Sequence, residues 1–239
     1  MIRQVRFDKK QRVVDELVRR IESGLMEDGF LLPGEHQLAQ EFQVSRGTLR
    51  EALALLVSDA LVTVEGQRGY RVAEISLGDL KDLTDTRVML ETEALRQSIR
   101  LGDARWESDL AQAFAALTEA EQQPGGLEPL RWEAANKRFH EALISAHRSP
   151  WSKHLLGILY RHGERYRQVA IRMGATQAVH RDVHDEHTSI YTAAMARQEA
   201  RAALALEAHI RLTCDILLQQ AANHPPEARQ AATELGLPA

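Results

Sequence analysis

Apolar residues recur three and four positions apart in the first part of the chain, a spacing that places side chains on one face of an α-helix. Residues 10–22 carry such a stripe, and Gly24 after it is a typical helix-ending residue. The stretch LLPGEHQLAQEF predicts a turn at Pro33–Gly34 and then a short helix. QVS interrupts the pattern, and Ser45 is a suitable N-cap for a second helix in RGTLREALALLVSDA. The side chains predicted to face inward are Val13, Val14, Leu17, Val18, Ile21, Leu38, Ala39, Phe42, Leu49, Ala52, Leu53 and Leu56.

The pattern changes after residue 60, where LVTVEGQRGYRVA supplies two short β-rich pieces. These pieces, Leu61–Val64 and Tyr70–Ala73, flank Gly66 and Gly69, which permit the turn of a hairpin. Helix, helix, tight turn, helix and hairpin is the order of a winged helix-turn-helix. We therefore predict this fold for residues 1–74.

From SLGDLKDL onward the pattern predicts helices alone. The helical stretches are interrupted at Gly102–Asp103, at residues 123–126, at Ser149–Pro150 and near Gly174. Ser149 followed by Pro150 is an N-cap with proline at the first helical position. Six or seven helices fit between residues 78 and 222. The predicted fold class is mainly α: an N-terminal winged helix-turn-helix at 1–74, a linker at 75–78, an all-α helical bundle at 79–222 and a C-terminal tail at 223–239.

Composition and charge restrict the classes of protein that fit this pattern. Hydrophobic residues make up 44% of the 239 residues, and the single cysteine, Cys214, excludes an intrachain disulfide and a cysteine-rich zinc site. The opening MIRQVRFDKK lacks the apolar segment of a signal peptide, and no apolar run approaches the roughly 18 residues of a membrane span. We therefore expect a cytoplasmic protein without a membrane partner. Because the net charge is −4, any binding of nucleic acid depends on a local concentration of positive charge.

Such a local concentration is found in SRGTLR, at the start of the second helix of the helix-turn-helix. Free N–H groups and the dipole at a helix N-terminus favour phosphate, and Ser45 and Thr48 add short donors. Arg46 and Arg50 lie one turn apart, where a guanidinium can bind the O6 and N7 of guanine or a phosphate. Two arginines alone also fit a solvated helix face. Their place in this ordered set of elements favours DNA binding.

The stretch LLPGEHQLAQEFQVSRGTLREALALLVSDALVTVEGQRGYRV resembles the DNA-binding domain of the GntR family of bacterial transcription regulators. The matching pieces are the LPGE entry, the QLAQEFQVSR turn, the TLREAL helix and the GQRGYRV wing. The resemblance implies operator contacts from Ser45, Arg46, Gly47, Thr48 and Arg50, with support from Gln67, Arg68 and Gly69 in the wing.

Two positions depart from the family pattern. His36 stands where the family often has an arginine that contacts DNA, and Gly47 stands where a side chain is common. Histidine can donate to a phosphate, but it has no assured charge near neutral pH. We therefore expect His36 to contact DNA and to weaken or re-tune operator binding without abolishing it. Near the hairpin tip, Arg68 and Arg71 are placed to follow the DNA backbone or to enter the minor groove.

The helical part is similar to the FCD domain, the ligand-binding domain of FadR-like GntR regulators. The similarity rests on the number of helices and on DLKDLTDTRVMLETEAL, NKRFHEALISAHRSPW and DEHTSIYTAAMARQEARAALALEAH. It implies a homodimer that binds double-stranded, pseudo-palindromic operator DNA, and a small organic acid effector bound in the helical domain. Such a protein regulates transcription and is not an enzyme.

Several of the ten histidines fall at helical intervals. In NKRFH, Asn136 and His140 lie four residues apart on one helix face, which fits two stacked polar residues as well as half of a metal site. A metal site needs three or four ligands converging from different helices, which a bundle can supply. The FCD resemblance implies the set Asn136, His140, His187 and His209. His184 competes with His187 for one of these places, and the spacing of 22 residues to His209 favours His187.

Asn136 determines the electrostatics expected of that site. Three neutral imidazoles and a carboxylate leave a divalent ion with a net charge of +1, whereas the amide leaves +2. We therefore expect a more loosely held metal with a stronger attraction for an anionic effector. Imidazole-rich sites suit zinc or nickel, and open coordination positions would take water or a carboxylate of the effector. His180 and His184 are expected to line the pocket or to be exposed.

Arg87, one turn before Glu91 in TRVMLE, is the candidate for effector binding. Two hypotheses fit this pair. The first is an intrahelical ion pair worth about 0.3 kcal/mol. The second, which the resemblance implies, is that Arg87 binds an effector carboxylate with its planar fork. Nearby aromatic side chains are expected in the core: Trp132, Phe139, Tyr160 and Tyr191.

Two other functions fit parts of the pattern. The same kind of regulator can bind its effector directly through histidines, without a metal. A metal-dependent enzyme with a DNA-binding domain would instead use the cluster to activate water, and it would need a general base. Glu141 and Glu186 are adjacent to His140 and His187 in sequence, but neighbours on a helix point about 100° apart.

Overall fold

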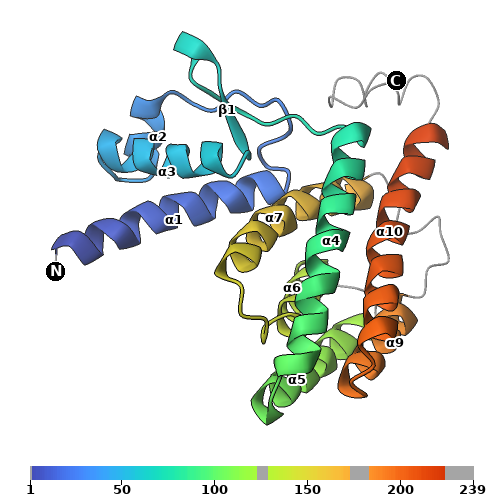
Figure 1. Cartoon of the computed structure of the whole chain (residues 1–239). Helices are drawn as coiled ribbons and strands as arrows, with labels where there is room; N and C mark the ends of the chain where they lie inside the picture. The colour runs from blue at the N-terminus through green and yellow to red at the C-terminus, as the bar shows by residue number, and fades with distance from the viewer. Residues whose placement is uncertain (1, 123–128, 173–182, 224–239) are drawn as a thin grey trace. The chain divides into compact units, whose positions relative to one another are not determined.

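The computed structural model describes residues 2–122, 129–172 and 183–223, which form helices and one small β-hairpin (Figure 1). The chain divides into two compact units. The first comprises residues 1–83, 158–176 and 217–239, and the second comprises residues 84–157 and 177–216.

The first unit contains the predicted winged helix-turn-helix. Its elements are α1 (Ile2–Glu22), α2 (Glu35–Glu41), α3 (Arg46–Ser58), β1 (Val62–Val64), the 3-10 turn η1 (Gly66–Arg68) and β2 (Tyr70–Val72). The strands pair antiparallel, with Val62 opposite Val72 and Val64 opposite Tyr70. The order of elements follows the prediction, and α1 begins at Ile2 rather than at residue 10.

One apolar core joins α1, α2, α3 and the hairpin. Leu17, Leu38 and Leu53 are fully buried in it, and α1 lies along α3 (Figure 1). Each apolar stripe predicted from the sequence faces this core. Val18 and Phe42, both predicted to point inward, pack at its edge and are partly buried. Burial of these stripes fixes the position of α3 and leaves its opposite face exposed.

A sharp turn joins α2 to α3. Gln43 adopts a φ of 52°, and the Val44 N–H donates to the carbonyl of Ala39 at 3.0 Å. The predicted N-cap is confirmed, because Ser45 Oγ accepts the backbone N–H of Thr48 at 3.1 Å. This bond satisfies one of the free donors at the start of α3.

The C-terminal half of α7 (Pro150–Arg172) belongs to the first unit, although its sequence periodicity placed the whole helix in the second domain. Arg165 has a side chain that is 3% exposed, and it donates to Asp28 and to the carbonyl of Ala73. A buried guanidinium needs partners that replace its hydration. Those partners lie about a hundred residues away in sequence, so helical periodicity does not reveal them.

The connection to the second unit is shorter than expected. Because α4 (Leu77–Leu101) begins at Leu77, the last two residues of the predicted linker 75–78 are the first two of this helix. Ser76 Oγ accepts the N–H of Asp79 at 3.0 Å and so caps the first turn. Tyr166 from α7 donates to Asp79 at 2.6 Å. Burial and this hydrogen bond raise the pKa of Tyr166 far above its ordinary value.

The second unit is a helical bundle. With α4 and the start of α7 it contains α5 (Ala104–Glu121), α6 (Pro129–Leu143), α9 (Val183–Met195) and most of α10 (Glu199–Asn223). Among the described residues, six helices thus lie beyond the hairpin, in agreement with the six or seven predicted. Helices α4 and α10 run side by side in opposite directions (Figure 1). Two ion pairs link them, Asp85 to Arg211 at 2.6 Å and Arg100 to Glu199 at 3.2 Å.

Two predicted helix boundaries are confirmed by their caps. Asp103 accepts the N–H groups of Arg105 and Trp106 at the start of α5, both at 3.0 Å. A Cβ on Gly102 would lie 2.4 Å from the ring of Trp106, so only glycine fits before this cap. Ser149 caps α7, and Pro150 is its first residue. The predicted boundaries at 123–126 and near Gly174, and the tail from residue 224, lie outside the described residues.

The buried stripe of α3 predicts a contrast between two nearby leucines. Leu53 is fully buried, whereas Leu55 is 38% exposed. Leu53→Ala should lower the free energy of unfolding by about 2–5 kcal/mol, because it removes packed methyl groups and leaves a cavity. Leu55→Ala should change it by less than about 0.5 kcal/mol. Urea denaturation followed by circular dichroism measures both, and equal losses would contradict this packing of α3.

Candidate functional site

The exposed face of α3 carries the arginines predicted to contact DNA. Arg46 and Arg50 are both exposed. Arg46 Nη2 lies 3.3 Å from His36 Nδ1, so the structure brings together two of the predicted DNA-binding residues. Arg50 Nε donates to Glu35 Oε2 at 2.7 Å. With the Arg50 side chain 65% exposed, this ion pair is weak and can exchange for a stronger anion.

The short polar residues at the start of α3 divide into two kinds. Thr48 is buried, and its hydroxyl lies 2.9 Å from Ser45 Oγ, so its side chain serves the helix cap. Ser45 and Gly47 are exposed at the end of the helix. A Cβ at Gly47 would meet Ser45 Oγ at 3.8 Å, an ordinary contact, so space does not require glycine there.

The wing places one arginine outward and one inward. Gly69, with φ of 106° and ψ of −132°, occupies a conformation open mainly to glycine, and Arg68 beside it is exposed. Arg71 instead turns toward the protein, where it donates to Glu65 and to the carbonyl of Gly29. In this structure the Arg71 guanidinium holds the hairpin through these partners, and its contact with the DNA backbone or the minor groove stays a prediction. The side chain of Gln67 lies outside the described residues.

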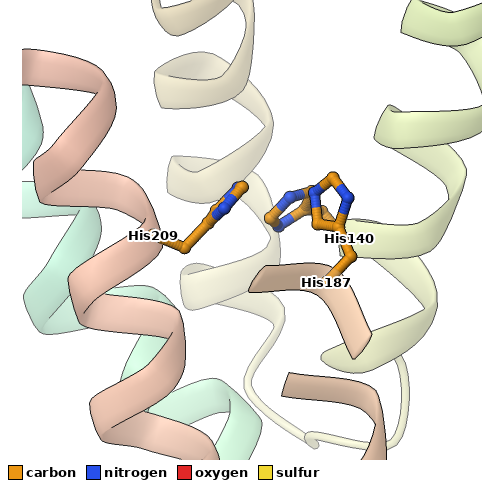
Figure 2. Close-up of side chains that lie close together, drawn as sticks. All are labelled: His140, His187 and His209. Carbon is orange, nitrogen blue, oxygen red and sulfur yellow. The ribbon is translucent and has the colours of Figure 1, made fainter. Parts of the chain in front are cut away.

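Three buried histidines converge from three helices of the second unit. His140 on α6, His187 on α9 and His209 on α10 point toward one another (Figure 2). One ring nitrogen from each lies within 4.8 Å of the others. Asn136, one turn before His140, is 5% exposed, and its Oδ1 is buried and accepts no hydrogen bond from the described residues. The structure thus brings together the three histidines that the resemblance implied. It also buries Asn136, which lies one helical turn before His140.

Carboxylates hold the outer nitrogens of two of these rings. His187 Nδ1 lies 2.7 Å from Glu121 Oε1, and His209 Nδ1 lies 2.7 Å from Glu186 Oε2. An ionised carboxylate only accepts hydrogen bonds, so each Nδ1 carries a proton and each neutral ring has its lone pair on Nε2. His187 Nε2 is buried and has no hydrogen-bond partner among the described residues. A lone pair on a nitrogen in such a place is suited to a metal ion.

His184, the competing ligand, has a different position. Its Nδ1 lies 2.8 Å from Glu121 Oε2, and its side chain is 31% exposed. The nitrogens of the cluster belong to His187 and not to His184. His180 lies outside the described residues.

Glu121, which the sequence analysis did not identify, accepts from both histidines at once. Burial alone would raise the pKa of its carboxyl, but hydrogen bonds from His187 and His184 hold that pKa below its ordinary value. Glu121 is more than sixty residues from both histidines in the chain, so no local spacing could have indicated it.

The residues considered as a general base have other positions. Glu186 accepts from His209, and Glu141 is exposed. Phe139 is fully buried and packs edge-on against His140 and His187, with ring centroids 5.6 and 5.4 Å away. The histidines are therefore packed against Phe139, while Glu186 is engaged by His209 and Glu141 lies at the surface.

Arg87 and Glu91 form the ion pair that was one of the two hypotheses. Arg87 Nε donates to Glu91 Oε1 at 2.7 Å. The two side chains are only 11% and 1% exposed. The pair is therefore buried, where both the cost of desolvating the charges and their mutual attraction are larger than on a helix surface.

The other predicted core aromatics lie in two environments. Tyr160 is buried, and Tyr191 stacks on Phe114 with centroids 4.1 Å apart.

Within the described residues, no helix has the length and apolar character to cross a membrane.

The donor set fits a divalent transition-metal ion. One ligand atom from each of three histidines on separate helices lies within 4.8 Å of the others, and Asn136 Oδ1, one turn before His140 on α6, is buried without a hydrogen-bond donor among the described residues. Imidazole-rich sets of this kind suit zinc, nickel and related ions. Carboxylate partners behind the rings are the usual support of histidine ligands.

Comparison with known proteins assigns two domain families to the chain. Residues 9–72 match the family of bacterial regulatory proteins, gntR family, and residues 82–212 match the FCD domain. The uncharacterized HTH-type transcriptional regulator BphR of Paraburkholderia xenovorans is 37% identical over 215 residues, covering 87% of this chain and 86% of that protein. The HTH-type transcriptional repressor GlaR of Escherichia coli is 32% identical over 186 residues, covering 77% of this chain and 84% of GlaR.

A solved structure, Escherichia coli McbR/YncC, shares the fold at lower identity. The two structures superpose with a TM-score of 0.73 at 18% sequence identity. The match covers 89% of this chain and 98% of the McbR/YncC chain. The FCD match alone spans more than half of the chain, and BphR is similar over most of its length. The chain therefore belongs to the GntR family of bacterial regulatory proteins, with an FCD domain after its DNA-binding domain, and it is a transcription regulator and not an enzyme.

Proposed function

We propose that this regulator is a repressor whose affinity for its operator is controlled by an organic acid bound at a divalent metal ion in the FCD domain. The observation that carries the proposal is the buried cluster of His140, His187 and His209, whose nitrogens converge from three helices. Three imidazoles that each bring one ligand atom to a common point, from three separate helices, have the arrangement that a metal ion requires.

Relatives support the chemical class of the effector. The gluconate operon transcriptional repressor of Bacillus subtilis is 30% identical over 141 residues, and the galactonate operon transcriptional repressor of Escherichia coli is 28% identical over 160 residues. Gluconate and galactonate are hydroxy acids, and carboxylate and hydroxyl oxygens can both bind a metal ion. We extend to this chain the class of acid, and not either compound.

In this proposal, the three histidines hold zinc or nickel through one nitrogen each, and Asn136 Oδ1 is the fourth ligand. Such an ion supplies positive charge and open coordination positions for the carboxylate of an acid. The Glu121 and Glu186 carboxylates behind the rings add two negative charges close by. The excess charge of +2 expected from the ligands alone is therefore largely compensated, and the attraction for an anion is weaker than the sequence suggested.

Arg87 is the proposed second anchor for the acid. Its pairing with Glu91 holds the guanidinium in one orientation, and its side chain is 11% exposed. A planar guanidinium in a protected place is well suited to a carboxylate.

In the DNA-binding domain, α3 is the proposed recognition helix. Arg46 and Arg50 would contact base edges or phosphates in the major groove, with Ser45, His36 and the wing residues Arg68 and Gly69 positioning the DNA. A homodimer would place two such helices in successive major grooves of a pseudo-palindromic operator. Binding of the acid and binding of DNA would then change each other's affinity by the same factor.

Substitutions in α3 test the DNA-binding part. Arg46→Ala and Arg50→Ala should each weaken binding at least about tenfold, because a good bidentate contact to a base is worth about 1–3 kcal/mol. The probe is a duplex selected by the wild-type protein from random sequences, measured by fluorescence anisotropy. Arg105→Ala, at a side chain 89% exposed on α5, is the control and should bind normally. Unchanged affinity in both α3 variants would show that another element recognises the operator.

Substitutions in the cluster test the metal-binding part. Untagged protein should bind zinc or nickel at one site per chain, and His140→Ala, His187→Ala and His209→Ala should each abolish tight binding. His154→Ala, at an exposed histidine on α7, should have no effect. Calorimetric titration measures affinity and stoichiometry. A thermal-shift screen of hydroxy acids, with and without metal, then tests the effector. Stabilisation by an acid in metal-free protein would favour direct binding by the histidines.

Asn136→Asp tests the fourth ligand. A carboxylate is a stronger ligand and removes one positive charge, so the variant should bind metal more tightly and the acid more weakly. Both affinities are measured by the same titrations. If neither changes, Asn136 does not bind the metal, and only His140 of the NKRFH pair belongs to the site.

A further inference from the structure

We infer that Glu121 is a positioning residue that fixes the tautomer of His187 and is itself held in place by His184, while Glu186 has the same role for His209. This inference rests on the proposed metal-binding function, and it assigns roles to three residues that are not ligands. It explains why a carboxylate from α5 is buried against two histidines of α9.

Both oxygens of Glu121 are used. Oε1 lies 2.7 Å from His187 Nδ1, and Oε2 lies 2.8 Å from His184 Nδ1. The Glu121 side chain is 7% exposed, so water contributes little to its solvation. Two ring nitrogens, one at each oxygen, fix the carboxylate in one rotamer.

The ionised carboxylate selects one tautomer of His187. With the proton on Nδ1, the ring donates to Glu121 and presents the lone pair of Nε2 to the cluster. With the proton on Nε2, the Nδ1 lone pair would face an oxygen lone pair at 2.7 Å, which is repulsive. The buried Nε2 would also lack an acceptor among the described residues. Glu121 therefore makes His187 ready to bind a metal ion before any ion arrives.

His184 secures the other side of Glu121. Its ring lies nearly parallel to that of Phe114, with centroids 6.2 Å apart, and Phe114 stacks in turn on Tyr191. The ring of His184 is thus packed on one side. Its Nδ1 binds Glu121 Oε2, the oxygen that His187 does not contact. His184 acts on the cluster through Glu121 alone, so its removal should have a smaller effect than removal of Glu121.

The same arrangement occurs independently at His209. Glu186 Oε2 lies 2.7 Å from His209 Nδ1, and this carboxylate comes from α9 rather than from α5. Two carboxylates on different helices thus meet the Nδ1 of two cluster histidines at the same distance. Loss of such a partner behind a histidine ligand typically costs 10- to 100-fold in metal affinity, which sets the size of the expected effect at roughly that range.

The first experiment is performed on metal-free, full-length protein with ¹⁵N-labelled histidine. Long-range ¹H–¹⁵N correlation spectra distinguish a protonated ring nitrogen from a bare one. In the wild type, His187, His184 and His209 should all be protonated at Nδ1. A proton on Nε2 of His187 in the wild type would overturn the inference without any variant.

Glu121→Gln gives the sharper test. An amide has one accepting oxygen and one donating nitrogen, so it cannot accept from two Nδ1–H groups. Either His187 or His184 should therefore change to the Nε2–H tautomer. Zinc affinity, measured by competition with a chromophoric chelator, should fall 10- to 100-fold for Glu121→Gln and for Glu186→Gln, and less for His184→Asn.

Glu119→Gln is the matched control, because Glu119 is on the same helix and its side chain is 72% exposed. It should leave tautomers and zinc affinity unchanged. If Glu121→Gln and Glu186→Gln also leave both unchanged while the wild type binds zinc, the carboxylates are structural and the inference is wrong. If the wild type binds no metal, the proposed function fails, while the tautomers of the metal-free protein still decide the role of Glu121.

Discussion

The second unit depends on how imidazoles are accommodated in an apolar interior. A buried polar group without a hydrogen bond costs several kcal/mol, so each ring nitrogen has to be satisfied by the protein or by a ligand. Glu121 and Glu186 satisfy the outer nitrogens of His187 and His209. Packing of Phe139 against two of the rings restricts their movement. The three helices thus bring one ligand atom from each histidine to a common centre, which is the arrangement that the proposed metal requires.

In the DNA-binding unit, too, some polar side chains have hydrogen-bond partners within the protein, and others are exposed. Ser45 and Thr48 satisfy the start of α3 through the cap, and Arg71 is occupied by Glu65 and by the carbonyl of Gly29. Arg46 and Arg50 are exposed and make only exchangeable surface contacts. Buried partners therefore identify the polar residues that build the domain, and exposure identifies those that remain for the operator.

Sequence periodicity predicted the fold well wherever local rules apply. The stripes of α1 and α3, the N-caps at Ser45 and Ser149 and the hairpin at residues 61–73 were all expected. Periodicity did not reveal that the C-terminal half of α7 is grouped with the first unit, where Arg165 is buried against Asp28. An apolar stripe indicates which face of a helix is buried, but it does not indicate which other element packs against that face.

For the candidate sites, the sequence by itself determined the residue types and, through the family resemblance, the set Asn136, His140, His187 and His209. It also determined that Arg46 and Arg50 share a helix face, because helical geometry relates positions one turn apart. Only the tertiary structure decided between His187 and His184, turned Arg71 inward and brought Glu121 to the cluster. The physical reason is that hydrogen bonds between distant segments are set by how helices pack, and packing joins residues that no spacing along the chain connects.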